Sequence, residues 1–183
     1  FKLLQEKALG RKLTGSSSRP KQRRSVPLSS IQGLDWKLPG FLPANDISLL
    51  WGMRGAGKTR IALEMALQLI DGKGLLDREG TYEPCNVLFV ASDSGGSPLK
   101  EELQKMGIAD DDERFEKLDL WCFSQEVQTS AWGIDLRGRI ELFEWAKSNT
   151  GSVVILDSAK SICSKGGVDY TNNELVTEFM TFL

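Results

Sequence analysis

The sequence contains no histidine, and this absence excludes whole classes of active site. Catalytic triads built on an imidazole and zinc sites with histidine ligands are both ruled out. The three cysteines, Cys85, Cys122 and Cys163, are scattered along the chain and odd in number, which is typical of neither a disulfide framework nor a metal site. We therefore expect a protein of the reducing cytoplasm.

Long apolar runs are also absent, because none approaches the roughly 18 residues that a membrane span requires. The N-terminus is polar and basic and has no apolar signal-peptide core. We therefore expect no membrane partner. The 183 residues amount to about one domain. The chain begins at Phe1 and ends at Leu183 within an apolar, helix-like segment, and we expect it to be a fragment of a longer protein.

The net charge of −2 is unevenly distributed. Residues 1–30 hold eight basic residues and one acidic residue, so they carry +7 and the remainder carries −9. This segment is also rich in serine and polar residues, which predicts a flexible basic linker or arm over 1–30 before a folded domain over 31–183. Such an arm contacts nucleic acid in some proteins and is only a solvated linker in others.

Apolar runs that predict buried strands alternate with segments of helical spacing. The expected strands are Ile47–Trp51, Val87–Ala91, Leu118–Phe123 and Ser152–Asp157. The expected helices are Lys58–Asp71, Ser97–Gly107 with Ser97 as N-cap, Asp135–Ser148 with Leu136, Ile140 and Phe143 on one face, and a last helix opened by Thr171–Glu174. This alternation predicts an α/β fold with a mostly parallel sheet covered on both faces.

Between the first expected strand and the first expected helix, the sequence matches the phosphate-binding pattern G-x-x-x-x-G-K-[ST]. Its glycines allow successive backbone N–H groups to point at one spot and cradle phosphate oxygens. The strand before and the helix after supply the structural context that this motif requires. We therefore predict ATP binding by Gly52, Met53, Arg54, Gly55, Ala56, Gly57, Lys58, Thr59 and Arg60.

Two residues of this loop have expected roles in catalysis. Lys58 would reach the β- and γ-phosphates, and the Thr59 hydroxyl would be a ligand of Mg²⁺. Such sites need a second carboxylate near Mg²⁺, and Asp157 ends an apolar strand where that carboxylate is expected. The alternative is that Asp157 is a turn or N-cap residue.

Hydrolysis also needs a group that orients or deprotonates the attacking water. Asp93 is the main candidate, because it follows the second strand at the carboxyl edge of the sheet. It is otherwise a turn residue of Ser92–Gly96. Glu101 and Glu102 are alternatives, although their helical spacing favours a solvated face.

Several segments together resemble RecA-like ATPases. Leu38–Ala44, the run Ile47–Trp51 and the loop Gly52–Thr59 are similar to the opening of that fold, in particular in hexameric replicative helicases of plasmids and phages and in primase-associated ATPase domains. The resemblance covers about residues 36–183. It implies a three-layer fold, ATP hydrolysis with Mg²⁺, single-stranded DNA as a partner and a hexameric ring.

The resemblance also extends to the acidic residues. Ala91–Leu103 is similar to a family segment whose catalytic glutamate falls on Asp93, which is one methylene shorter. Val153–Lys160 resembles the segment of the metal-binding aspartate. The resemblance implies that the next strand, a polar sensor residue, DNA-contacting loops and an arginine finger would follow Leu183. The sheet would then lack a strand at its centre, and we expect the fragment to be marginally stable or prone to aggregation.

Other functions remain open at this point. The chain is alternatively a RecA-like regulatory or loading ATPase that acts on a protein partner. A non-hydrolysing nucleotide-binding module is a third possibility, which the aspartate at position 93 keeps open. A small-molecule kinase is disfavoured, because the folded part has no cluster of arginines for an acceptor-binding lid.

Overall fold

The computed structural model describes residues 27–75, 82–123, 132–133, 135–165 and 167. The chain divides into two units, Phe1–Gly33 and Leu34–Leu183. In the first unit the described residues form one 3₁₀ turn, η1 (Leu28–Ser30). Most of the expected basic arm, and the last helix expected after Thr171, lie outside the described residues.

The second unit begins with a short antiparallel hairpin of β1 (Trp36–Leu38) and β2 (Leu42–Pro43). Leu38 is almost fully buried and belongs to the same core cluster as the first long helix. The hairpin therefore anchors the chain to the domain just before the phosphate loop.

A parallel sheet forms the middle of the second unit. Its strands, in spatial order, are β4 (Leu118–Phe123), β3 (Val87–Gly95) and β5 (Val153–Asp157). The central strand β3 runs parallel to both neighbours, and Ala91 pairs with Asp157 on β5. The parallel arrangement brings the carboxyl ends of all three strands to one edge, which is where α/β folds bind ligands.

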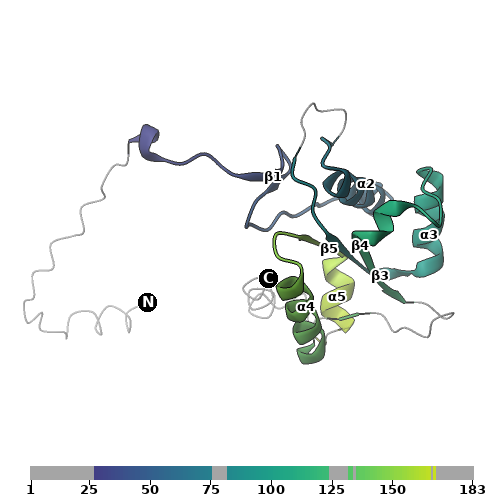
Figure 1. Cartoon of the computed structure of the whole chain (residues 1–183). Helices are drawn as coiled ribbons and strands as arrows, with labels where there is room; N and C mark the ends of the chain where they lie inside the picture. The colour runs from purple at the N-terminus through teal and green to yellow at the C-terminus, as the bar shows by residue number, and fades with distance from the viewer. Residues whose placement is uncertain (1–26, 76–81, 124–131, 134, 166, 168–183) are drawn as a thin grey trace, which may run out of the picture. The chain divides into compact units, whose positions relative to one another are not determined.

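Helices cover both faces of this sheet (Figure 1). Alternate side chains of a strand point to opposite faces, so Val87, Phe89 and Ala91 join one core cluster and Leu88 and Val90 the other. The first cluster includes α2 (Lys58–Asp71) and α3 (Gly96–Lys105). The second includes α4 (Leu136–Ser148) and α5 (Ala159–Lys165). The predicted α/β fold, three-layer with a parallel sheet, is confirmed.

Helix α2 has the bounds that its sequence predicts. Its buried side chains recur at helical spacing and face the sheet: Ala62, Leu63, Ala66, Leu67, Leu69 and Ile70. The helix begins after Gly57 and ends before Gly72, whose N–H bonds to the carbonyl of Gln68. Local signals therefore suffice to specify this helix.

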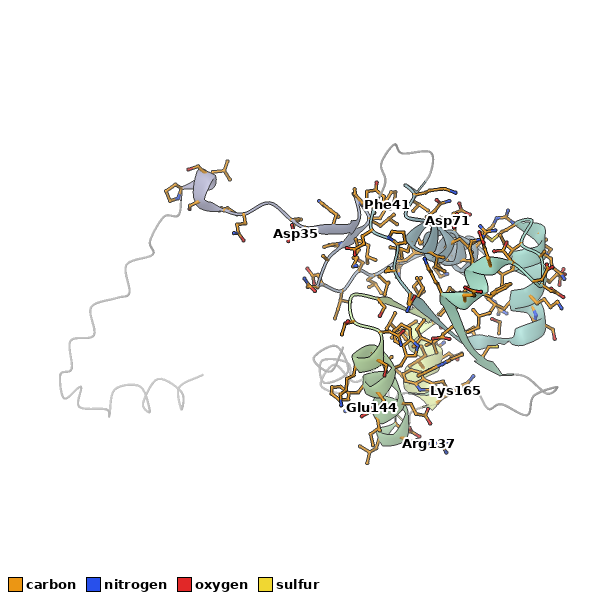
Figure 2. All side chains as sticks on the ribbon, viewed as in Figure 1. Asp35, Phe41, Asp71, Arg137, Glu144 and Lys165 are labelled. Atoms are coloured by element: carbon orange, nitrogen blue, oxygen red, sulfur yellow. The ribbon has the colours of Figure 1, made fainter. Side chains whose placement is uncertain are left out.

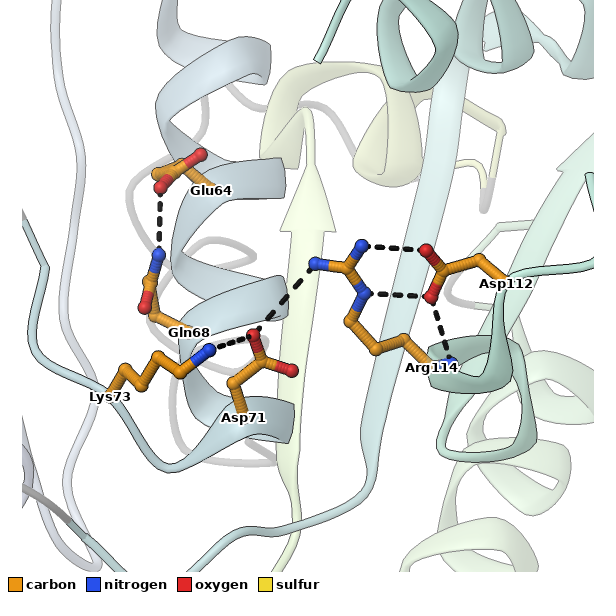
Figure 3. Close-up of polar contacts among 6 residues, drawn as sticks. All are labelled: Glu64, Gln68, Asp71, Lys73, Asp112 and Arg114. Atoms are coloured by element: carbon orange, nitrogen blue, oxygen red, sulfur yellow. Dashed lines mark hydrogen bonds and ion pairs between the residues drawn. The ribbon is translucent and has the colours of Figure 1, made fainter. Parts of the chain in front are cut away.

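A polar network attaches the C-terminal end of α2 to the turn η2 (Glu113–Glu116) that leads into β4 (Figure 3). The Arg114 guanidinium donates two hydrogen bonds, of 2.7 and 2.6 Å, to the carboxylate of Asp112. It also lies 3.8 Å from the carboxylate of Asp71, which pairs with Lys73 at 3.1 Å. Bidentate arginine–carboxylate geometry of this kind fixes orientation as well as adding energy.

The prediction of a strand over Ile47–Trp51 is wrong, because these residues form no strand in the structure. Their side chains are exposed: 77% for Leu49 and 86% for Trp51. The physical reason is that a strand needs a hydrogen-bonded neighbour, and the described residues supply none here. Trp51, expected as a buried aromatic at a strand end, lies in solvent.

Strand β3 is longer than expected, so Asp93 lies within it and not in a turn after it. Consequently α3 begins at Gly96, and Gly95 occupies the N-cap position expected for Ser97. The pairing of β3 with β4 is irregular between Ala91 and Gly95. The prediction of a strand that ends at Ala91 followed the apolar run and could not detect this extension.

Helix α4 is confirmed, but its most apolar face points away from the core. Leu136, Ile140 and Phe143 are 76%, 55% and 61% exposed, whereas Gly138 and Leu142 are buried. A Cβ placed on Gly138 would lie 1.9 Å from the carbonyl oxygen of Gly133. This close backbone approach sets the rotation of the helix.

Arg137, on the outer side of α4 in Figure 2, is 88% exposed and pairs with Glu141 at 2.8 Å.

Within the described ranges, no helix combines the length and hydrophobicity that a bilayer crossing requires.

Candidate nucleotide-binding site

The backbone of the phosphate loop leaves amide groups available at the start of α2. Gly55 and Gly57 both have φ of +79°, a conformation that side-chain-bearing residues rarely adopt. Gly57 is the N-cap, and no side chain caps the helix. The first N–H groups of α2 therefore have no helical partner, and they form the positive end of the helix dipole. This arrangement suits an anion.

Lys58 folds back over the loop from the first position of α2. Its Nζ donates hydrogen bonds to the carbonyl oxygens of Gly52, at 3.0 Å, and Met53, at 2.9 Å. The aliphatic part of the side chain passes Gly52, where a Cβ would lie 3.7 Å from Cδ of Lys58. The loop thus holds an ammonium group against its own backbone, within reach of whatever anion the amides bind.

Thr59 and Asp157 are in direct contact, although 98 residues separate them in the sequence. The Thr59 hydroxyl donates a hydrogen bond of 2.7 Å to Oδ2 of Asp157. Their oxygens are ligands of the kind that Mg²⁺ prefers. In the parts of the chain that are described, no group of three or more His, Cys, Asp or Glu side chains could hold a metal. A hydroxyl and one carboxylate fit Mg²⁺ that takes its remaining ligands from phosphates and water.

Asp93 lies next to this pair, at the carboxyl end of the neighbouring strand. It is two residues beyond Ala91, which pairs with Asp157, and its Oδ2 accepts a hydrogen bond of 2.7 Å from the hydroxyl of Ser158. Desolvation raises the pKa of Asp93, but the hydroxyls of Ser161 and Ser158 and two lysines outweigh it and lower the pKa below its usual value. Asp93 is therefore ionised near neutral pH.

Helix α5 is attached to the end of β3 through Ser92. The hydroxyl of Ser161 donates to the carbonyl oxygen of Ser92 at 3.2 Å, and Nζ of Lys165 donates to the same oxygen. Ser92 is buried, and its own hydroxyl donates to the carbonyl oxygen of Trp132 at 2.7 Å. These contacts fix the backbone directly before Asp93.

The side chains of several other residues predicted for the site lie at the surface. The guanidinium of Arg60 lies 3.9 Å from Glu102 on α3, and Met53, Arg54 and Ala56 are exposed. Lys105 forms ion pairs with both Glu101 and Glu102, so these two alternative carboxylates belong to a charged surface of α3.

Sequence reasoning gave Ser158 no role of its own. It directly follows Asp157, through a cis peptide bond, and contacts Asp93 on another strand. The available signal was a hydroxyl residue immediately after the expected metal-binding aspartate.

The comparisons with known proteins agree with this geometry. A family model described as an AAA domain matches residues 19–182. Neither a curated protein nor a solved structure was found to match the chain. The matched region contains the phosphate loop and both aspartates. The chain belongs to the AAA domain family of P-loop ATPases.

Proposed function

We propose that the chain binds ATP with Mg²⁺ and hydrolyses it as the motor domain of a helicase-like protein that acts on single-stranded DNA. One observation carries the ATPase part: the 2.7 Å hydrogen bond between Thr59 and Asp157 joins the phosphate loop to the carboxyl end of β5. In a chance glycine-rich turn, nothing would require a carboxylate from a distant strand beside the hydroxyl of the motif.

The loop and Lys58 bind the phosphates in this proposal. The free N–H groups at the start of α2 donate to phosphate oxygens, and Lys58 exchanges its two carbonyl contacts for the β- and γ-phosphates. Both interactions strengthen as charge develops on the transferred group, which is the main source of catalysis in phosphoryl transfer.

Thr59 and Asp157 would hold Mg²⁺, which neutralises charge on the β- and γ-phosphates when it is bound. The Thr59 hydroxyl now donates to Asp157. Its lone pairs are still available for a cation, so the same two side chains serve as ligands without rearrangement of the backbone.

Asp93 would orient the attacking water. Because its pKa is lowered, it is a weak base, and its contribution is a hydrogen bond that holds the water in line with the γ-phosphate. Its exposed side chain at the edge of the sheet is accessible to such a water.

The DNA partner and the ring are supported by the resemblance to hexameric helicases and by the excess of basic residues in 1–30. In a ring, an arginine of a neighbouring subunit would stabilise the transition state.

The experiment is a steady-state ATPase assay of the full-length protein, without nucleic acid and with single-stranded DNA, duplex DNA or RNA. We expect turnover to rise with single-stranded DNA and to vanish in Lys58→Met. If several single-stranded DNAs leave turnover unchanged while ATP is still hydrolysed, the DNA-motor proposal fails. A protein partner that raises turnover would then favour the regulatory ATPase.

A further inference from the structure

Ser158 connects the positions of the two carboxylates. It follows Asp157 in the chain, and its hydroxyl donates a hydrogen bond of 2.7 Å to Oδ2 of Asp93. Asp93 is exposed, and the hydroxyl of Ser158, together with that of Ser161, which also faces the carboxylate, restricts the rotamers that its side chain can adopt. The bond from Ser158 holds Oδ2, and the carboxylate has further acceptor sites that can bind a water.

Ser158 is itself held from two directions. Its Oγ accepts a hydrogen bond of 3.4 Å from the N–H of Ser161, and its carbonyl oxygen accepts one of 3.1 Å from Ile162. Ile162 is fully buried against the sheet. The hydroxyl therefore projects from a fixed helix start, and its hydrogen has one obvious acceptor, Asp93.

We propose that Ser158 is a positioning residue for ATP hydrolysis, whose hydroxyl orients the Asp93 carboxylate relative to Asp157. This inference rests on the proposed ATPase function. The side chain of Asp93 is one methylene shorter than that of the glutamate that the RecA-like resemblance implies at this position. It therefore has fewer conformations in which it can reach the attacking water. A misplacement of about 1 Å in a reacting group costs on the order of a hundredfold in rate, which makes such a fixed orientation useful.

The test compares Ser158→Ala, Ser158→Thr and the control Ser164→Ala in the full-length protein. Ser164 is an exposed hydroxyl residue on α5, the helix that follows Ser158. We expect Ser158→Ala to lower kcat about tenfold, the order expected for one hydrogen bond to a charged group, with an unchanged KM for ATP. Ser158→Thr, which keeps the hydroxyl, restores most of the rate, and Ser164→Ala matches the wild type.

A double-mutant cycle with Asp93→Asn separates positioning from a general structural effect. If Ser158 acts through Asp93, Ser158→Ala causes no further loss in the Asp93→Asn background. Equal losses in both backgrounds, a raised KM, or wild-type kcat in Ser158→Ala would each overturn the inference while leaving the ATPase proposal intact. Absence of hydrolysis in the wild type would overturn both.

Discussion

Thr59, at the start of α2, donates a hydrogen bond of 2.7 Å to Asp157 at the end of β5. The contact joins the phosphate loop to the sheet through two side chains that are both partly exposed. A stability role alone would not require oxygen ligands at this point, since an apolar pair would fill the same space. The pair therefore predicts a magnesium-dependent step in nucleotide binding.

Thr59→Val should weaken ATP binding in the presence of Mg²⁺ by about tenfold, because it removes one oxygen ligand and keeps the shape. Isothermal titration of the variant with ATP, in Mg²⁺ and in EDTA, measures this. Thr59→Ser retains the hydroxyl and should bind as the wild type does. Binding by Thr59→Val that equals the wild type in Mg²⁺ would exclude this hydroxyl as a ligand.

Lys58→Met should abolish the rise in Tm that ATP or ADP causes, while the Tm without nucleotide changes little. Among the described residues, the hydrogen bonds of the Lys58 ammonium go to carbonyl oxygens of its own loop. Its loss should therefore weaken nucleotide binding more than it destabilises the fold. Ligand-induced stabilisation grows with the logarithm of ligand concentration over Kd, and thermal shift measurements follow it. The matched control is Lys73→Met, on an exposed lysine beyond the end of α2. A retained shift in Lys58→Met would contradict the predicted phosphate contact.

The parts of the structure that the sequence predicts well are those with local signals. Helix α2 has apolar periodicity and a glycine beyond each end, and β4 is apolar at every position except Asp119. The failures depend on tertiary contacts that apolar periodicity does not encode. A strand at Ile47–Trp51 requires a neighbour, and the rotation of α4 depends on contact between Gly138 and Gly133. Apolar periodicity places Leu136, Ile140 and Phe143 on one face of the helix, and it cannot detect that Gly138 makes the closest contact.

The site shows the same division. The loop Gly52–Thr59 and the strand-end position of Asp157 follow from spacing, and parallel strands bring their carboxyl ends together. The hydrogen bond from Ser158 to Asp93 joins the residue after β5 to the end of β3. It depends on the register in which Ala91 pairs with Asp157, and a single sequence does not contain that register.

Gly138→Ala should destabilise the fold by about 1–3 kcal/mol, the usual cost of overpacking. The new Cβ would lie 1.9 Å from the Gly133 carbonyl oxygen and 3.1 Å from Cε2 of Trp132, so α4 or the loop must move. At an exposed helix position the same change would be stabilising. The sign of the change in unfolding free energy therefore distinguishes a packed Gly138 from an exposed one. Urea unfolding measures the difference, with Arg137→Ala as the control on the same helix. Gly138→Ala that is as stable as the wild type would contradict the described packing of α4.

Asp112→Asn should remove an acid-dependent part of the stability. Hydrogen bonds from the side chain and backbone of Arg114 lower the pKa of Asp112 to about 2 in the folded chain. Because the folded pKa is below the ordinary value of 3.8, the stabilisation is fully present above about pH 4 and is lost as the pH falls through about 2. Urea midpoints of wild type and variant should differ at about pH 6 and converge as the pH approaches about 2. A difference between Asp112→Asn and the wild type that is independent of pH would contradict the assignment.

The exposed segment Ile47–Trp51 should make the 183-residue chain self-associate. Its apolar side chains are in solvent, and β5 has a strand partner on only one side among the described residues. Exposed apolar segments and unpaired strand edges are the usual origin of polydisperse association. Sedimentation velocity should therefore show broad, concentration-dependent species.

The charged double variant Leu49→Lys, Trp51→Lys tests whether this segment is the cause. It should narrow the distribution and retain the nucleotide-induced rise in Tm, because Lys58, Thr59 and Asp157 are unchanged. Thr150→Lys adds charge at an exposed turn and should leave the association as it was. A wild-type chain that sediments as a single monomeric species over a range of concentrations would contradict the predicted self-association through Ile47–Trp51. A single discrete oligomer would favour the ring, whereas a polydisperse series that the variant abolishes would identify Ile47–Trp51 as the associating surface.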